Sequence, residues 1–153
     1  QMASAIMLFA LMPVIISSGG NSGSQASTLI IQAMALGEVT LGDWWRVMRR
    51  EILSGLLLGL ILGALGFIRI MAWQSFAHSY GQYWVLVALV ISLSLVGVVL
   101  WGSLMGSMLP FVMKRLGADP ASSSAPFVST LVDVTGLLIY FSVATLILKG
   151  VLL

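Results

Sequence analysis

The chain of 153 residues alternates between long apolar stretches and short polar segments. A helix that spans a membrane needs about 20 predominantly apolar residues. Stretches of that kind lie at about 3–36, 51–71, 83–113 and 126–148. The pattern therefore predicts an all-α membrane protein, a polytopic helical bundle to which this chain contributes four spanning helices.

The composition excludes several classes of protein. Hydrophobic residues make up 59% of the chain and charged residues 8%, whereas a soluble domain carries charge on about a quarter of its residues. The absence of cysteine removes disulfides, thiolate metal sites and cysteine nucleophiles, and the single histidine, His78, removes most zinc chemistry. A net charge of +2 is too small to favour nucleic acid as a partner, so the expected surroundings are membrane lipid.

The basic residues predict an orientation. Five of them lie in or beside the loops 37–50 and 114–125, which share one side, and three lie on the other side. The positive-inside rule then places these loops in the cytoplasm and 72–82 and the C-terminus outside the plasma (inner) membrane. The five are Arg46, Arg49, Arg50, Lys114 and Arg115, and the three are Arg69, His78 and Lys149.

This orientation places residue 1 on the outer side. The first residues, QMASAIMLF, include neither a charged leader nor a cleavage motif that would explain an exported start. We therefore expect a fragment, whose parent has at least one more spanning segment upstream.

Small residues recur at helical spacing in the first three apolar stretches. In lipid, such rows let helix backbones approach closely, because helix association there depends on packing and hydrogen bonds. The rows in the second and third stretches are interpreted as packing faces. The small residues are Gly19, Gly23 and Ser27, then Gly55, Gly59 and Gly63, then Gly102, Ser103, Gly106 and Ser107.

The first stretch differs because the run 13–28, PVIISSGGNSGSQAST, brings polar groups to membrane depth. Polar or irregular backbone is tolerated there only where it is buried in protein or lines a water-filled cavity. The stretch is too long for an upright span, so we expect it to tilt, bend or project into the cytoplasm, with a break in the helix near Gly19 and Gly20 as one possibility. Asn21 and Gln25, four residues apart on one face, either bond neighbouring helices or line a pore, and the sequence leaves both interpretations open.

Asp133 is the one acidic residue inside a predicted span, roughly 10 Å along the helix from Pro126. An acid within a membrane span indicates a functional site, and a stripe of small and polar residues beside it would let water reach it and favour cation passage. The structural alternative is a protonated Asp133 bonded to Thr130 or Thr135. The stripe consists of Ala125, Ser129, Asp133 and Gly136.

The donor set favours a hydrated ion. Mg²⁺ is usually held through one or two carboxylates with several waters retained, whereas Ca²⁺ takes six to eight oxygen ligands. One acid per chain is sparse for Ca²⁺. If a twofold axis ran through a pore, two copies of Asp133 would face one ion, and twofold dimers are the commonest closed assembly.

Two motifs in the chain resemble those of a known family. The first is Pro13 followed by GGNSGSQ at 19–25; the second is LGADPA at 116–121 with DVTG at 133–136. The second motif also includes Ser124, Pro126 and Thr130. In both motifs the chain resembles the transmembrane domain of the MgtE magnesium channels and, more distantly, the eukaryotic solute-carrier magnesium transporters.

The resemblance implies a five-helix domain, of which this chain would supply the last four helices, in a homodimer with the pore on the dimer axis. Cytoplasmic regulatory domains would precede it. A hydrated Mg²⁺ would lie near Asp133, with the backbone carbonyl of Ser129 facing the pore and Glu51 at the cytoplasmic mouth. Glu51 would either add negative potential there or form a salt bridge with Arg49, Arg50 or another basic residue of the loops. The implied pore-lining residues are Gly19, Gly20, Asn21, Ser24, Gln25, Ala125, Ser129 and Gly136.

Two positions depart from the family pattern. Many relatives have asparagine where this chain has Ser24 and Ala125, and these differences concern gating and selectivity. The central carboxylate is unaffected.

The predicted function is a Mg²⁺-selective channel or transporter that carries Mg²⁺, and also Mn²⁺ or Co²⁺, into the cytoplasm. A divalent ion gains roughly 4.6 kcal/mol per 100 mV, twice the value for one charge, so no energy-coupling module is required. The alternative is a proton- or sodium-coupled divalent cation exchanger, since broken helices beside a buried acid also occur in secondary transporters. An enzyme is not expected, because no set of residues has the spacing for acid-base or nucleophilic chemistry.

Overall fold

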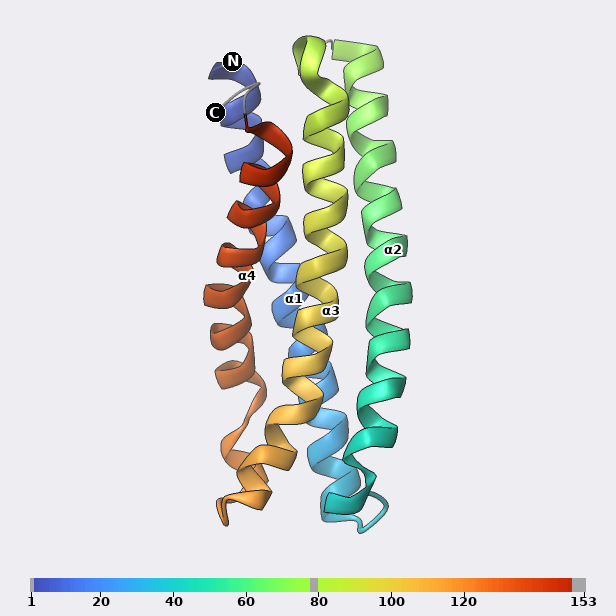
Figure 1. Cartoon of the computed structure of the whole chain (residues 1–153), viewed down its shortest axis with the longest axis vertical. Coiled ribbons are helices and arrows are strands. Elements are labelled where there is room, and N and C mark those ends of the chain that lie inside the picture. Colours follow the sequence, from blue (N-terminus) through green and yellow to red (C-terminus); the bar gives the residue numbers. More distant parts are fainter. Residues whose placement is uncertain (1, 78–79, 150–153) are drawn as a thin grey trace.

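The computed structural model describes residues 2–77 and 80–149 as a bundle of four long helices (Figure 1). No strand occurs among these residues, so the all-α prediction is confirmed. His78 lies outside the described residues. The helices are α1 (Met2–Ala35), α2 (Trp44–Ala77), α3 (Trp84–Arg115) and α4 (Ala125–Leu148), and short 3₁₀ turns at the connections are η1 (Leu41–Asp43), η2 (Gly81–Tyr83) and η3 (Pro120–Ser122).

The connections gather at the two ends of the bundle. The α1–α2 and α3–α4 loops lie at one end, and the α2–α3 turn lies at the other with the start of α1 and the end of α4 (Figure 1). The two loops with the basic residues therefore share an end, as the sequence predicts. We call the end of the bundle with the α1–α2 and α3–α4 loops the loop end.

Within the described residues, three helical segments are long and apolar enough to cross a membrane: Leu41–Phe76, Gly81–Arg115 and Ala125–Leu148. α1 is as long as α2 but is not among these three segments, so the first span stays a prediction. α2 begins at Trp44, well before the apolar stretch at 51–71, because the basic segment WWRVMRRE is also helical. The helix thus extends beyond its apolar part at both ends.

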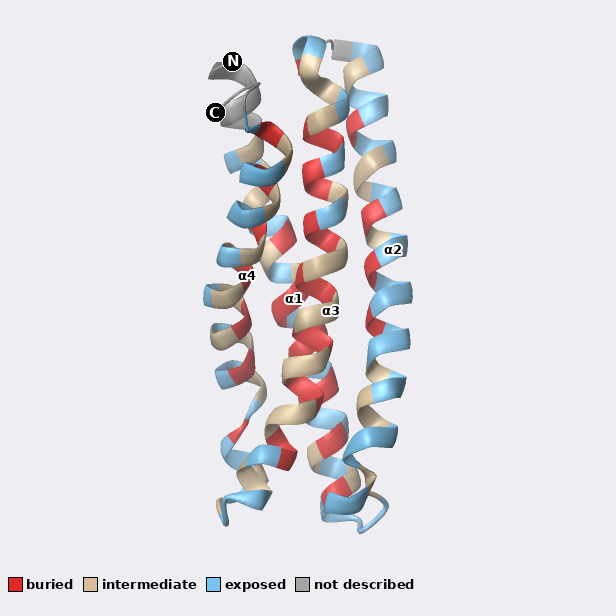
Figure 2. Ribbon diagram, in the orientation of Figure 1, coloured by how far each residue is buried: buried red, intermediate tan, exposed pale blue. Residues whose placement is uncertain are grey.

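α3 is the central helix and contacts each of the other three. Half of its apolar stretch is buried, against 17% of that of α2, which packs on α3 by one face only. Figure 2 shows the other face of α2 exposed along its length. In a membrane this apolar face, with Leu53, Leu57, Leu60 and Ile61, would contact lipid.

The glycine rows lie where helices cross, as the sequence predicts. A Cβ on Gly106 would lie 2.7 Å from the carbonyl carbon of Gly23, and a Cβ on Gly102 would meet the carbonyl oxygen of Gly19. On the other side of α3, a Cβ on Gly59 would lie 2.9 Å from the Cα of Val96. Glycine at these positions lets the backbones approach more closely than any side chain would permit.

The expected break near Gly19 and Gly20 is wrong, because α1 is one continuous helix through both residues. The described glycines with positive φ lie in turns: Gly37 (φ 74°), Gly81 (φ 63°) and Gly117 (φ 78°). The glycines of α1 therefore keep helical geometry and serve instead to reduce the bulk of the helix where it meets its neighbours.

Candidate ion site

Two serine hydroxyls of α1 hold the start of α4 in place. Ser24 donates its hydroxyl to the carbonyl oxygen of Ala125 at 3.0 Å, and the buried Ser27 donates to the carbonyl of Ser123 at 2.6 Å. The first carbonyl belongs to α4 itself and the second to the loop before it. These bonds fix the register between α1 and α4, and thereby determine which residues of the two helices lie opposite each other.

That register brings three predicted site residues together. A Cβ on Gly20 would lie 2.7 Å from Oδ1 of Asp133 and 2.7 Å from Oγ of Ser129. Both distances are too short for a carbon atom next to an oxygen, so only glycine leaves room for the carboxylate and the hydroxyl side by side. Gly20 of α1 thus lies directly against the polar stripe of α4.

A groove of about 380 Å³ lies between α1 and α4 beside these residues. Its α1 wall contains a row spaced by four residues, Pro13, Ser17 and Asn21, and all three are exposed. Asn21 is one of the predicted site residues, whereas Ser17 was not predicted, although it lies four positions before Asn21 on the same helix face. The lining residues are Met12, Pro13, Ile16, Ser17, Asn21, Ser129 and Asp133.

The carboxylate of Asp133 is not bonded to the hydroxyls that the structural alternative proposed. Its Oδ1 is buried and has no hydrogen-bond partner among the described residues. Thr130 donates its hydroxyl to the carbonyl of Pro126 at 2.9 Å, and Thr135 donates to the carbonyl of Leu131 at 2.8 Å. A buried oxygen of this kind carries a cost unless a donor or a cation reaches it.

No positive side chain neutralises Asp133 either. In the described parts of the chain, the one ion pair within 4 Å joins Arg46 to Asp43 at 2.9 Å, at the loop end. The same residues contain no group of three or more His, Cys, Asp or Glu side chains able to surround a metal. A single chain therefore offers one carboxylate at this site, which suits an ion that keeps most of its water.

Gly19 and Gly136 lie away from the groove. A Cβ on either would contact the side chain of Val98 in α3, so both pack at the centre of the bundle. Gly19 also faces Val132 of α4. Ala125 lies at the first position of α4, where its carbonyl accepts the bond from Ser24.

The amides of Asn21 and Gln25 form none of the hydrogen bonds seen between the described helices, several of which come from serines instead. The amide of Asn21 donates to Ser17 of its own helix at 3.4 Å. Instead, the buried hydroxyls of Ser22 in α1 and Ser103 in α3 lie 2.6 Å apart. Asn21 is thus exposed on the groove, and the hydrogen bond between α1 and α3 comes from a serine pair that was not predicted.

Gln25 and Glu51 line a different cavity, of about 770 Å³, between α1 and α2 near the loop end. Arg46, Arg50 and Glu38 also line it. Among the described residues Glu51 forms no ion pair within 4 Å, so the expected salt bridge with its neighbours in sequence is absent. Residues one or two positions apart on a helix do not face each other.

These features define the class of the protein as a polytopic helical membrane protein with a carboxylate in a groove between two helices. A family profile described as a divalent cation transporter, MgtE, matches residues 12–143. The chain belongs to the MgtE family, as its motifs indicated. This is a family of transporters and not of enzymes.

Individual relatives agree. The chain is 47% identical to the magnesium transporter MgtE of Thermus thermophilus over 91% of its own length and 29% of that protein. It is 30% identical to the magnesium transporter MgtE of Enterococcus faecalis, over 95% of the chain and 30% of the relative. The corresponding protein of Bacillus subtilis is 29% identical over 92% of the chain and 29% of that protein. The chain thus spans less than a third of the length of these relatives.

Proposed function

We propose that this chain forms the ion-conducting part of a Mg²⁺ transporter, and that Asp133 holds a hydrated Mg²⁺ as it passes. The observation that carries the proposal is the carboxylate of Asp133, which lies in the α1–α4 groove with a buried oxygen that no described group bonds. An acid within a membrane span is costly and marks an ion pathway. The relatives named magnesium transporters support Mg²⁺ as the ion.

The exposed wall of the groove supports a homodimer. Ser17 and Asn21 are exposed on one chain, and polar groups facing lipid are unfavourable. A second copy across a twofold axis would cover them and add a second Asp133. Two carboxylates facing a retained water shell match the usual coordination of Mg²⁺.

Gly20 and Ser129 complete the site in this proposal. Gly20 leaves the space in which the carboxylate lies, and the hydroxyl of Ser129 is beside the same position. The hydroxyl and the backbone carbonyl of Ser129 accept hydrogen bonds from the water shell of the ion. Mn²⁺ and Co²⁺ are expected to follow the same path, since this site selects by charge and hydration and offers no soft ligand.

The direction of transport follows from the membrane potential. With the basic loops in the cytoplasm of a cell whose plasma membrane is negative inside, a divalent cation gains roughly 4.6 kcal/mol per 100 mV on entry. Passive conduction into the cytoplasm then needs no coupled ion.

Uptake of Mg²⁺ into proteoliposomes that hold the complete protein tests this proposal. A potassium diffusion potential is applied, with pH and Na⁺ equal on both sides. We expect uptake that rises with the potential. Uptake that appears only with an opposing proton or sodium gradient would replace the channel with the coupled exchanger, and no uptake in either condition would refute Mg²⁺ transport.

A further inference from the structure

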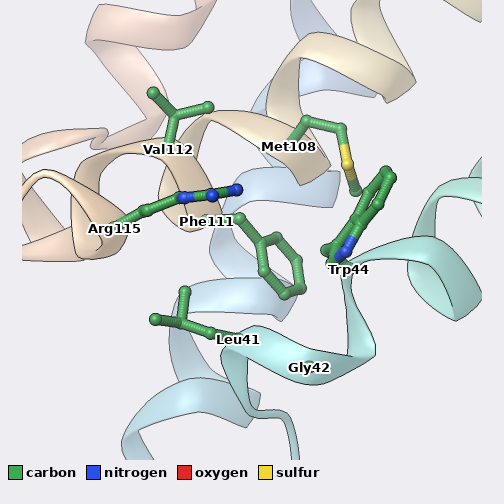
Figure 3. A pocket seen from close by; sticks show the side chains of 7 residues that line it. All are labelled: Leu41, Gly42, Trp44, Met108, Phe111, Val112 and Arg115. Carbon is green, nitrogen blue, oxygen red and sulfur yellow. The ribbon is translucent and has the colours of Figure 1, made fainter.

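A separate pocket of about 400 Å³ lies at the loop end, where η1 and the start of α2 meet the last turns of α3 (Figure 3). Its size falls in the range of ligand clefts, about 300–1,000 Å³. The pocket does not include any residue of the α1–α4 groove. It is lined by Leu41, Gly42, Trp44, Met108, Phe111, Val112 and Arg115.

The lining combines an apolar interior with one positive charge. Phe111 forms the buried wall and is 5% exposed, whereas Trp44 and Val112 are about half exposed at the mouth. Arg115 lines the pocket and is exposed as well, and Figure 3 shows its side chain extending toward Phe111. The pocket thus presents a cation above an apolar interior.

The guanidinium of Arg115 has no carboxylate to pair with. Throughout the described residues, Arg46 and Asp43 form the one ion pair within 4 Å, and Arg115 is exposed. Guanidinium groups bind phosphate through two parallel hydrogen bonds, which an ammonium group cannot reproduce. The charge at the mouth is therefore suited to a phosphate group.

The position of the pocket along the bundle matches the membrane–water interface. Trp44 and Trp45 are exposed beside it, and tryptophan is enriched at the headgroup level of membranes. Lys114 and Arg115 form the last turn of α3. A phospholipid at this level would bring its phosphate to Arg115 and its first acyl carbons to Phe111 and Met108.

We propose that this pocket binds an anionic phospholipid of the leaflet at the loop end, one molecule per chain. The phosphate pairs with the guanidinium of Arg115, and the upper part of one acyl chain fills the space beside Trp44 and Phe111. Basic pockets beside transmembrane helices bind lipid headgroups in the same way. The proposal is independent of the ion site.

Native mass spectrometry tests the proposal on the complete protein released from nanodiscs of equal parts phosphatidylglycerol and phosphatidylcholine. We expect one retained phosphatidylglycerol per chain. Arg115→Gln is expected to lower the ratio of retained phosphatidylglycerol to phosphatidylcholine at least fivefold, about 1 kcal/mol. Lys114→Gln is the matched control, because it removes the same charge from the same helix turn outside the pocket, and it is expected to change the ratio less than about twofold.

A second pair of variants tests the pocket itself. Val112→Glu places a carboxylate at the mouth, three residues before Arg115, and is expected to abolish retention, whereas Val112→Leu keeps it. An unchanged ratio in Arg115→Gln, or equal losses in Arg115→Gln and Lys114→Gln, would overturn the proposal. So would a photo-cross-linker at position 112 that captures another protein segment in place of lipid.

Discussion

Asp133 and Gly20 illustrate how one small residue determines what an acidic residue can do. Asp133 lies on α4, but the space for its carboxylate is provided by α1, where Gly20 has no side chain. Any larger residue at position 20 would force the carboxylate and the hydroxyl of Ser129 apart. The glycine is thus part of the proposed ion site without offering a ligand.

Gly20→Ala is expected to lower Mg²⁺ uptake at least about tenfold, equivalent to ~1.4 kcal/mol. The added methyl group would lie 2.7 Å from Oδ1 of Asp133 and must displace it. Uptake by the complete protein in proteoliposomes measures the effect. Gly97→Ala is the control, because its Cβ would meet only the Cγ2 methyl group of Ile139, at 3.1 Å. Equal uptake by the two variants would contradict the role of Gly20.

Asp133 could be predicted as a site residue because an acid inside an apolar stretch stands out in any membrane sequence, and Ser129 because it lies one turn before Asp133 in the small and polar stripe. Gly20 could not be identified as their direct neighbour, since that depends on the register between α1 and α4. Ser17 was also missed, although it lies four positions before Asn21 on the same helix face, because its place beside Asp133 becomes evident only with the groove. Contacts between helices are properties of the packing and cannot be read from one helix alone.

At the scale of elements, α3 holds the bundle together through two kinds of contact with α1. Backbone approaches backbone where Gly102 and Gly106 meet Gly19 and Gly23. Beside this crossing, a hydrogen bond joins the buried hydroxyls of Ser22 and Ser103. The glycine spacing predicted the backbone crossing. The predicted break near Gly19 and Gly20 was wrong, because a glycine pair in a polar run is typical both of a helix break and of a close crossing between helices.

Gly106→Ala is expected to destabilise the protein by about 1–3 kcal/mol, the usual cost of overpacking. Its Cβ would lie 2.7 Å from the carbonyl carbon of Gly23, so α1 and α3 must move apart. Thermal unfolding in detergent measures the loss. Gly66→Ala should be close to neutral, because its nearest contact is the flexible end of Leu95 at 3.0 Å; a similar loss in both variants would argue against a backbone crossing.

The serine pair is suited to a double-mutant cycle. Ser22→Ala, Ser103→Ala and the double variant are expected to show a coupling of about 0.6 kcal/mol, the average for hydrogen bonds between membrane helices. Unfolding in denaturing detergent gives the three free energies. Coupling near zero would mean that the 2.6 Å contact does not hold α1 to α3.

At the scale of the whole molecule, one chain leaves its groove incomplete. Ser17 and Asn21 are exposed beside a carboxylate that has no counter-charge among the described residues. The exposed apolar faces of the other helices are suited to contact with lipid, whereas the polar face of α1 beside the groove is not. The proposed homodimer would resolve the difference by covering the polar face with a second copy.

The chain has no cysteine, which makes the dimer directly testable by cross-linking in membranes. Asn21→Cys is expected to form disulfide-linked dimers under mild oxidation, because position 21 would face its counterpart across the axis. Leu65→Cys, on the exposed face of α2, should stay monomeric. Cross-linking at position 65 and not at 21 would place the dimer contact on the wrong face for the proposed pore.

The most direct test of the central claim is Mg²⁺ uptake by Asp133→Asn and Asp133→Ala, each compared with wild type in the complete protein at a fixed membrane potential. Glu38→Gln is the control, because it removes an exposed carboxylate near the loop end that has no part in the proposed site. Both Asp133 variants are expected to lose uptake at least about tenfold, since removing the charge leaves the hydrated ion without its counter-ion, while the control retains most of it. Uptake by both variants at the wild-type rate would show that Asp133 is structural and that the ion passes elsewhere.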